Sequence, residues 1–502
     1  MNRIQIILKR SEAKENWLIS PPLEGIGGGY EIHEINPPQA PPKRRSYPQS
    51  LLDDFFRKYF YKIQIILKLS LIIGLFSACQ SEETREFTPL EVTSAWAEMS
   101  LYITQFTPAN SPTYASRCFG YIGLTMYESV VHGYPSYQSL AGQLNELNTL
   151  PQPEEGKEYN WLLSLNAAQA TILDSIYMQT SDENKLKIDS LENLIHRLLG
   201  TDRAIAKRSK AYGQEVAKAI FAWSKTDGGH RGYLNNFDKE AVFPDRPGSW
   251  KPPLYAQSFS HHPLHPYWGK NRTFVKVNGE LPIPEMIPYD TTPGSAYFQQ
   301  FQEVYEQEQI LTQEQKEIAI WWSDDPDDTF TPPGHSYYLA KTAIEKSQVD
   351  LIQAAETYAR VGMACADAFI QCWKWKYHHF SERPNTFVPK FIDPTWDSFW
   401  PDPPFPSFPS GHAIQAAAMA TVLTDLYGNT LAFTDSAHVG RERDELRDTD
   451  FVAQEFESFW QVATETADSR FYGGIHTHQD NQVGMDGGTT IANNVNSLAW
   501  RK

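Results

Sequence analysis

From about residue 90 onward, apolar residues recur every three or four positions, which is the spacing of one face of an α-helix. Alternation with a period of two, which is typical of half-buried strands, is scarce. Hydrophobic residues make up 41% of the 502 residues, enough to bury a sizeable core. The sequence therefore predicts an all-α protein of packed helical bundles. The first five predicted helical segments are 91–105, 112–132, 159–179, 183–199 and 201–225.

Glycine and proline concentrate between residues 227 and 296 and interrupt any regular element there. We predict an N-terminal bundle over 90–226, an irregular connection over 227–310 and a C-terminal bundle over 311–500. Helix-capping residues mark helix starts in the last part: Thr312, Asp350, Ser410 and Asp450 precede predicted helices at 313–323, 351–377, 411–427 and 451–469.

The segment before the body has the parts of an export signal. Residues 69–78 form an apolar run that follows a basic flank and is followed directly by Cys79. The run is too short to cross a bilayer. We predict a lipoprotein-type signal over 63–79, with export to the periplasm or to the outer membrane or cell surface; an unlipidated leader is the alternative. Because a signal works from the start of a chain, residues 1–62 are interpreted as a dispensable extension or a mis-set translation start.

The charge of the chain argues against a nucleic-acid-binding protein, and its cysteines argue against a disulfide scaffold. The chain has 61 acidic against 44 basic residues, a net charge of −17, which repels the phosphate backbone of nucleic acids. Cys365 and Cys372 lie seven residues apart in a predicted helix, about 10.5 Å along its axis and too far for a disulfide. We expect them to be small apolar core residues.

Three short stretches of the second half carry residue types that bind a tetrahedral oxyanion. They are Lys376 with Arg383 and Pro384, then Pro-Ser-Gly-His at 409–412, then Ser-Arg at 469–470 with His476 and Asp480.

Such an anion needs positive charge and free amide groups. Lys376 supplies a point charge, and Arg383 and Arg470 supply planar forks that match paired oxygens. Ser410 and Gly411 begin a predicted helix, where free backbone N–H groups and the positive end of the dipole favour an anion. Each of these features alone is weak evidence, because basic residues at such spacings occur more often on a solvated helix face than in a binding site.

Two histidines complete the set. His412, in the first turn of that helix, is placed to face the same anion as a proton donor or acceptor. Asp480, one turn after His476, is placed to accept one ring N–H of His476 and so fix its tautomer. The other ring nitrogen of His476 is then free to donate a lone pair to a metal or phosphorus centre.

The ordered set resembles the signature shared by vanadium-dependent haloperoxidases and the type 2 phosphatidic acid phosphatase superfamily. The strict match covers residues 376–480, and the wider stretch 313–490 resembles the soluble bacterial haloperoxidase branch. The resemblance implies two helical bundles with the oxyanion site in the C-terminal one.

The resemblance also implies vanadate as the cofactor, with His476 as the axial ligand of vanadium through Nε2. His412 would hydrogen-bond the opposite apical oxygen. The residues that would hold the equatorial oxygens are Lys376, Arg383, Ser410, Gly411 and Arg470.

The implied partners are hydrogen peroxide, a halide and a small organic acceptor. A peroxovanadate at His476 would oxidise the halide to hypohalite, with bromide or iodide favoured over chloride. Trp373 and Phe405 match aromatic positions of family members that handle halide; ordinary aromatic packing is the alternative.

Two other functions stay open. An acid phosphatase of the same superfamily would use His476 as the nucleophile and His412 as the general acid. The absence of spans predicted from hydropathy in the body and the long helical stretch before the signature favour the haloperoxidase. A glycan-binding surface lipoprotein without catalysis is a remote alternative that leaves the signature unexplained.

Other candidate groups were weighed against ordinary roles. The acidic run 324–328 is predicted to be a solvated loop rather than a calcium site, although one of its carboxylates could orient an arginine of the site. His261, His262 and His265 are disfavoured as zinc ligands because Pro263 interrupts them. His478 is predicted to be an exposed polar residue rather than part of a pocket mouth.

Overall fold

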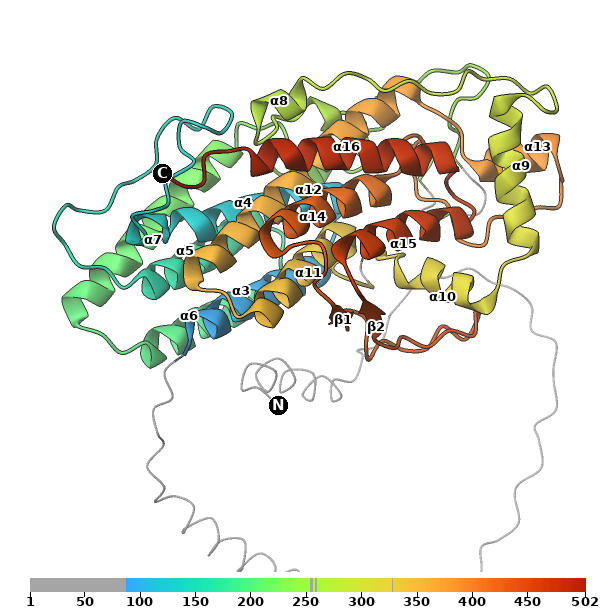
Figure 1. Ribbon diagram of the computed structural model, residues 1–502. Helices are drawn as coiled ribbons and strands as arrows, with labels where there is room; N and C mark the ends of the chain where they lie inside the picture. Colours follow the sequence, from blue (N-terminus) through green and yellow to red (C-terminus); the bar gives the residue numbers. More distant parts are fainter. Residues whose placement is uncertain (1–86, 253–255, 258–259, 327) are drawn as a thin grey trace, which may run out of the picture. The chain divides into compact units, whose positions relative to one another are not determined.

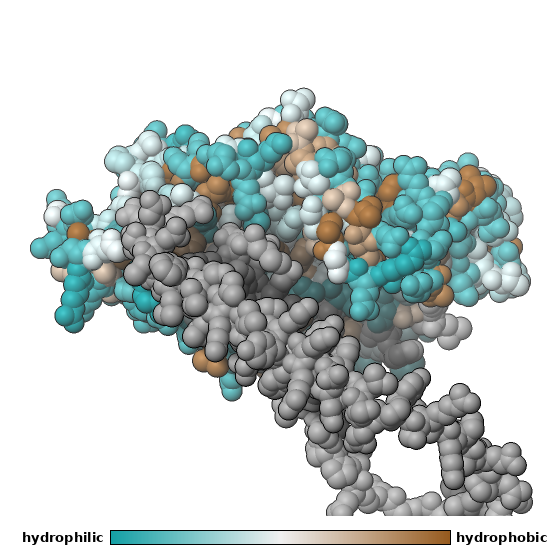
Figure 2. Space-filling view, turned by 90° about the horizontal axis from the view of Figure 1, so that it is seen from below, coloured by the Kyte–Doolittle hydropathy of each residue, from teal (hydrophilic) through white to brown (hydrophobic). Residues whose placement is uncertain are grey.

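The computed structural model describes residues 87–502 except 253–255, 258–259 and 327 (Figure 1). The predicted extension 1–62 and the predicted signal 63–79 lie outside the described residues. Residues 86–502 form one compact unit. No helix in the described part of the chain is long and apolar enough to cross a membrane. The face seen in Figure 2 is mostly hydrophilic with scattered apolar patches.

Between residues 87 and 226 the structure contains five long helices, and the all-α prediction is confirmed. Their bounds agree with the five predicted segments to within a few residues at each end. They are α3 (Pro89–Gln105), α4 (Pro112–Glu128), α5 (Trp161–Ile176), α6 (Asp182–Leu198) and α7 (Arg203–Ser224), followed by short turns such as η1 (Val131–Gly133) after α4.

The predicted irregular connection contains one long helix, so the prediction is wrong at its end. Short helical turns η2 (Gly232–Asn235), η3 (Trp268–Lys270) and α8 (Lys276–Gly279) are followed by α9 (Ala296–Gln309). α9 buries Tyr297, Phe301 and Val304, which have helical spacing. The many glutamines and glutamates around these residues obscured that spacing in the sequence.

The second half is built from seven helices and one small sheet. The helices are α10 (Gln313–Trp321), α11 (Thr331–Ser347), α12 (Leu351–His379), α13 (Pro384–Phe391), α14 (Gly411–Tyr427), α15 (Phe459–Tyr472) and α16 (His478–Asn496). The predicted helices at 313–323, 351–377 and 411–427 correspond to α10, α12 and α14.

The predicted helix over 451–469 is wrong in its first turns. Its cap is Ser458 rather than Asp450, and α15 begins at Phe459. Residues before it form β2 (Gln454–Phe456), which pairs antiparallel with β1 (Phe433–Asp435). Pairing with a strand about twenty residues earlier is a long-range effect that the local helical pattern does not report.

α12 is the central helix of the described unit and packs against α4, α11, α14 and α16 (Figure 1). Because α12 of the second half lies directly on α4 of the first, the two predicted bundles share a core. A shared core gives no boundary between the bundles, so the predicted bundle limits, 90–226 and 311–500, remain predictions. Cys365 and Cys372, both on α12, are buried and free, as predicted.

Glycines allow α4 and α12 to approach closely. A Cβ at Gly123 would lie 2.3 Å from the carbonyl oxygen of Tyr358, and a Cβ at Gly362 would lie 2.4 Å from that of Phe119. Both obstacles are backbone atoms, which cannot turn aside. The two helix backbones are therefore in contact at these glycines.

Gly123→Ala is expected to lower the free energy of unfolding by about 1–3 kcal/mol, because the helices must separate to admit the methyl group. Chemical denaturation measures this change. Gly200→Ala is the control: no atom lies within 4 Å of a Cβ there, so its effect should stay within about 0.5 kcal/mol. Equal losses in the two variants would show that the contact is unimportant.

Candidate functional site

A cavity of about 470 Å³ lies beside the N-terminus of α14. Six of the residues predicted for the site line it: Trp373, Phe405, Gly411, His412, Arg470 and His476. The first half of the chain supplies part of the wall, including Ala109, Asn110 and Ser111. Residues far apart in sequence therefore converge on one cavity, and both halves build it.

The N-terminus of α14 opens onto this cavity. Ser410 is the N-cap: its Oγ accepts a hydrogen bond from the N–H of Ala413 at 3.3 Å, and the residue is buried. A Cβ built at Gly411 would meet only the Trp373 ring, at 3.8 Å. The space beside Gly411 is thus open, and its amide and the helix dipole are available to an anion.

His476 is held in one orientation by Asp480. Its Nδ1 lies 2.8 Å from Oδ2 of Asp480, and Ser407 Oγ donates to the same oxygen at 2.5 Å. Burial, partly offset by the Asp480 hydrogen bond, lowers the pKa of His476 to about 3. The ring is therefore neutral at ordinary pH with its proton on Nδ1, and Nε2 has a free lone pair.

Three buried cations surround this nitrogen and the cavity. Arg383 Nη1 lies 3.5 Å from His476 Nε2. Lys376 and Arg383 do not themselves line the cavity; they lie behind Phe405, whose ring centroid is 5.2 Å from Lys376 Nζ and 5.2 Å from Arg383 Cζ. Backbone carbonyls accept from all three cations: Pro406 and Ser407 from Lys376, Phe405 and Ile475 from Arg383, and Ala319 from Arg470.

These cations lack a matching anion within the protein. Burial lowers the pKa of Lys376 to about 7, that of Arg470 to about 10, and that of Arg383 below its usual value. Among the described residues, no carboxylate lies within ion-pair distance of any of the three. An anion bound here would restore the favourable charge balance, so the donor set fits a tetrahedral oxyanion such as vanadate or phosphate.

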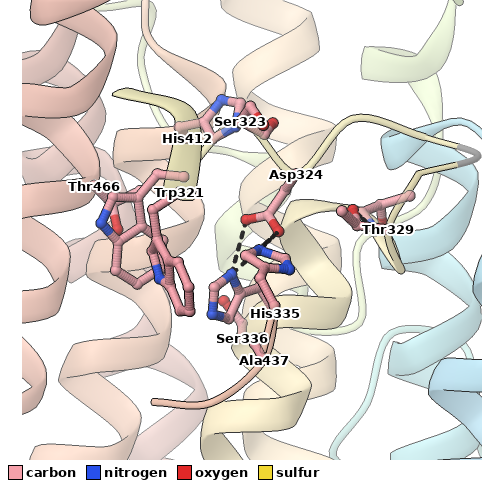
Figure 3. Close-up of polar contacts among 12 residues, drawn as sticks. Trp321, Ser323, Asp324, Thr329, His335, Ser336, His412, Ala437 and Thr466 are labelled. Atoms are coloured by element: carbon pink, nitrogen blue, oxygen red, sulfur yellow. Dashed lines mark hydrogen bonds and ion pairs between the residues drawn. The ribbon is translucent and has the colours of Figure 1, made fainter. Parts of the chain in front are cut away.

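His412 contacts a loop that follows α10. Its Nε2 lies 3.2 Å from the carbonyl oxygen of Ser323 (Figure 3). A carbonyl can only accept, so Nε2 carries the proton and Nδ1 is the acceptor nitrogen of the neutral ring. Burial, followed by the charge of Arg470, lowers the pKa of His412 well below its usual value. His412 is therefore a neutral base in the unliganded cavity.

The two predicted aromatic residues form one wall of the cavity. The ring centroids of Trp373 and Phe405 lie 4.9 Å apart. Trp373 Nε1 donates to the carbonyl oxygen of Leu264 at 3.1 Å, which fixes its ring. The wall is rigid and apolar, next to the buried cations.

The prediction that 324–328 is a solvated loop is wrong at its first residue. Asp324 is 1% exposed and lines the cavity, whereas Asp328 is exposed. Asp325 is partly buried and accepts a hydrogen bond from Gln257. The negative charges of Asp325 and Asp324 raise the pKa of Arg470 and so partly offset the effect of its burial. Neither carboxylate is within ion-pair distance of that arginine. Long-range packing of the loop against α11 determined this burial.

The structure places the other histidines that the sequence singled out away from the cavity lining. His478 is exposed, stacks on Phe471 at 3.8 Å and does not line the cavity. His265 is buried and bonded to the carbonyl of Gly232, and His261 is exposed. In the described part of the chain these histidines form no metal-binding group.

Sequence reasoning missed Ser323 and Ser407. Ser323 contributes only its backbone carbonyl, for which no residue type is diagnostic. Ser407 lies three residues before Ser410, but nothing local indicates that it donates to a carboxylate from the chain's end.

Asp480→Asn is expected to weaken vanadate binding about 10–100-fold, because the amide no longer fixes the tautomer and basicity of His476. Equilibrium dialysis with orthovanadate measures the loss. Asp486→Asn, on the same helix and with a carboxylate that accepts from Gln482, is the matched control. Unchanged binding in Asp480→Asn would show that the Asp480 contact is not needed.

The all-α fold, with a cavity lined by Arg470 at a helix N-terminus and two further buried cations behind Phe405, defines a helical protein whose site fits an oxyanion. Residues 356–501 match the family model described as the VCPO second helical-bundle domain. Over 221 residues, 34% of this chain, the sequence is 24% identical to the vanadium chloroperoxidase of Curvularia inaequalis, and the match spans 36% of that protein.

Solved structures resemble the chain over most of its length. A bacterial vanadium-dependent iodoperoxidase is 30% identical with a TM-score of 0.73, covering 84% of this chain and 99% of that one. A holo-type bacterial vanadium-dependent chloroperoxidase, 15% identical, has a TM-score of 0.58 and covers 83% and 93%. The chain belongs to the vanadium-dependent haloperoxidase family, within the superfamily that includes the type 2 phosphatidic acid phosphatases.

Proposed function

We propose that this chain is a vanadium-dependent haloperoxidase that uses hydrogen peroxide to oxidise iodide or bromide to hypohalite. The observation that carries the proposal is the cavity with three unmatched buried cations, a neutral His476 and the amide end of α14. The 30% identity to a bacterial iodoperoxidase supports iodide as the first halide to test.

In this proposal, His476 Nε2 would hold vanadate, which would supply a Lewis acid that activates hydrogen peroxide while vanadium keeps its oxidation state. Lys376, Arg383, Arg470, Ser410 and the Gly411 amide hold its oxygens by charge and hydrogen bonds.

The other residues prepare the reaction. Asp480 keeps the proton of His476 on Nδ1. His412 accepts a proton from incoming hydrogen peroxide at Nδ1, while Ser323 holds its Nε2–H. Trp373 and Phe405 shield the site from water and offer an apolar wall to a large polarisable halide and to a small organic acceptor.

The same geometry supports acid phosphatase activity as a second candidate. His476 has a free Nε2 that can attack phosphorus, and His412 lines the same cavity and can protonate a leaving oxygen. This candidate uses no vanadate, so the two functions are separable by experiment. The lipid anchor on Cys79 and export remain proposals from the sequence.

The test is to incubate purified protein with orthovanadate, hydrogen peroxide and chloride, bromide or iodide in turn, and to follow halogenation of a dye. Hydrolysis of p-nitrophenyl phosphate without vanadate is measured in parallel. The proposal requires halogenation that depends on vanadate and is fastest with iodide or bromide. Phosphate-ester hydrolysis without halogenation would favour the phosphatase, and failure to bind orthovanadate would leave a non-catalytic glycan-binding protein.

A further inference from the structure

A second cluster of ligand-type side chains lies next to the cavity, on the side of Ser323. It contains Asp324, His335 and His438, whose carboxylate and imidazole ligand atoms all lie within 4.8 Å of one another. All three side chains are buried, with exposed fractions of 1%, 1% and 2%. Among the described residues they are the one such group of three.

Three separate segments bring these residues together. Asp324 follows α10, His335 lies near the start of α11, and His438 lies in the turn after β1. Figure 3 shows the Asp324 side chain pointing at the imidazole of His335, with His412 and Ser323 on the other side of the loop. Asp324 also lines the cavity, which gives the cluster a path to solvent.

The distances suit ligands of one ion. His335 Nδ1 lies 2.9 Å from Asp324 Oδ2, and His438 Nε2 lies 2.9 Å from Asp324 Oδ1. Ligand atoms around a tetrahedral ion with bonds of about 2.0–2.2 Å are separated by about 3.3–3.6 Å. The ligand atoms of the three residues are already within 4.8 Å of one another, and the 2.9 Å contacts would lengthen by about half an ångström to admit a small divalent ion.

His438 provides an independent observation. Its Nε2 is fully buried and forms no hydrogen bond of good geometry in the described part of the chain; its close contact is Asp324 Oδ1, at 2.9 Å. A buried ring nitrogen without a well-formed hydrogen bond is costly, and a bound metal ion would remove that cost by occupying its lone pair.

Asp435 accepts a hydrogen bond from the second ring nitrogen of His335, a contact that metal-binding histidines usually make. Its Oδ2 lies 2.8 Å from His335 Nε2 and also accepts from Trp321 Nε1 at 3.1 Å. This leaves Nδ1 of His335 to face Asp324 and His438, in the carboxylate–histidine–metal arrangement. Trp322 stacks on the His335 ring at 4.7 Å and restricts its rotation.

The backbone at Asp324 adopts a strained conformation of the kind that is common at ligand sites. Its φ is +50°, in the left-handed region that non-glycine residues rarely adopt. Strain of this kind persists where surrounding contacts over-determine the conformation, and such residues concentrate at ligand and active sites. Here the two histidines hold the Asp324 carboxylate, and the adjacent Ser323 carbonyl faces His412.

We propose that Asp324, His335 and His438 bind one divalent ion of the zinc type, at a site that adjoins the oxyanion pocket through Asp324. Two imidazoles and one carboxylate match the ligand preference of zinc rather than that of calcium or magnesium, and they leave a fourth position toward the cavity. The two carboxylates, Asp324 and Asp435, balance the charge of a divalent ion. By holding the Ser323–Asp324 turn, the ion also positions the acceptor of His412.

The alternative occupant of the cluster is a proton. Although burial lowers it, the charges of Asp324 and Asp435 raise the pKa of His335 to about 10 in the absence of an ion. A protonated His335 would donate to both carboxylates, and His438 Nε2 would keep its 2.9 Å contact with Asp324. Zinc binding and this proton exclude each other, so measurement of metal content distinguishes them.

The test uses the purified full chain, stripped with a chelator and then titrated with zinc chloride, with bound metal measured by mass spectrometry after dialysis. We expect about one equivalent per chain, a higher melting temperature with zinc than with chelator, and no response to magnesium. His438→Gln should bind zinc at least about a hundredfold more weakly, and Asp435→Asn about 10–100-fold more weakly.

His261→Gln, at an exposed histidine, is the matched control and should bind zinc like the parent chain. Vanadate binding by His438→Gln, measured separately, should be retained, because none of the predicted vanadate-holding residues is altered. Equal zinc uptake by the parent and His438→Gln, or no uptake by the parent, would overturn the proposal and assign the cluster to a protonated His335. Either result leaves the test of the haloperoxidase proposal unaffected.

Discussion

Replacing His476 with alanine is expected to abolish vanadate-dependent halogenation. The variant loses the ring nitrogen of His476 that has a free lone pair beside the buried cations. Vanadate affinity should fall at least about a hundredfold, since even loss of a residue that only orients a ligand costs about 10–100-fold. Equilibrium dialysis with orthovanadate and the rate of iodide oxidation measure the two losses.

His478→Ala is the control for this variant. His478 lies two residues later, is exposed and stacks on Phe471 outside the cavity, so its affinity and rate should stay within about twofold of the parent. A melting curve checks that His476→Ala remains folded. Full halogenation by a folded His476→Ala would remove His476 from the proposed site.

Replacing His412 with alanine is expected to reduce turnover while vanadate remains bound. General acid–base catalysis by a positioned side chain contributes about 10²–10⁴-fold, so kcat should fall by that factor. Vanadate affinity should change by less than about tenfold, because His412 does not supply the charges that hold the oxygens. Stopped-flow halogenation at saturating vanadate measures kcat, and equilibrium dialysis with orthovanadate measures the affinity.

His412→Gln separates geometry from proton transfer. Its amide can still donate to the Ser323 carbonyl but cannot exchange a proton near neutral pH, so it should be as slow as the alanine variant. Recovery of turnover in His412→Gln would mean that His412 only supports the loop. Parallel losses of affinity and turnover in both variants would instead make His412 an anchor of the cofactor.

Much of the fold was predictable because helices bury one face at a regular spacing. The segments that became α3, α5 to α7 and α10 carry that spacing, whereas α4 and α14 are buried on nearly all sides and are marked by their apolar composition and their N-caps. α9 was missed because its three buried residues lie among glutamines and glutamates, and residues 454–456 were assigned to a helix because their strand partner lies at 433–435.

The site was predictable to a similar degree. Short motifs identified the residue types that an oxyanion requires, and the local i, i+4 spacing placed Asp480 beside His476. The burial of Asp324 and the partner of Ser407 were not predictable, since each depends on a contact with a distant segment.

The sequence by itself determined the helical class, the family signature and the identity of the groups at the oxyanion pocket, because local spacing and residue chemistry specify these properties. Only the tertiary structure decided that the first half of the chain supplies part of the cavity wall and that Lys376 and Arg383 lie behind Phe405. It also decided that Asp324, His335 and His438 meet. The physical reason is that burial and charge shifts arise from contacts between residues far apart in the chain, and no local pattern records them.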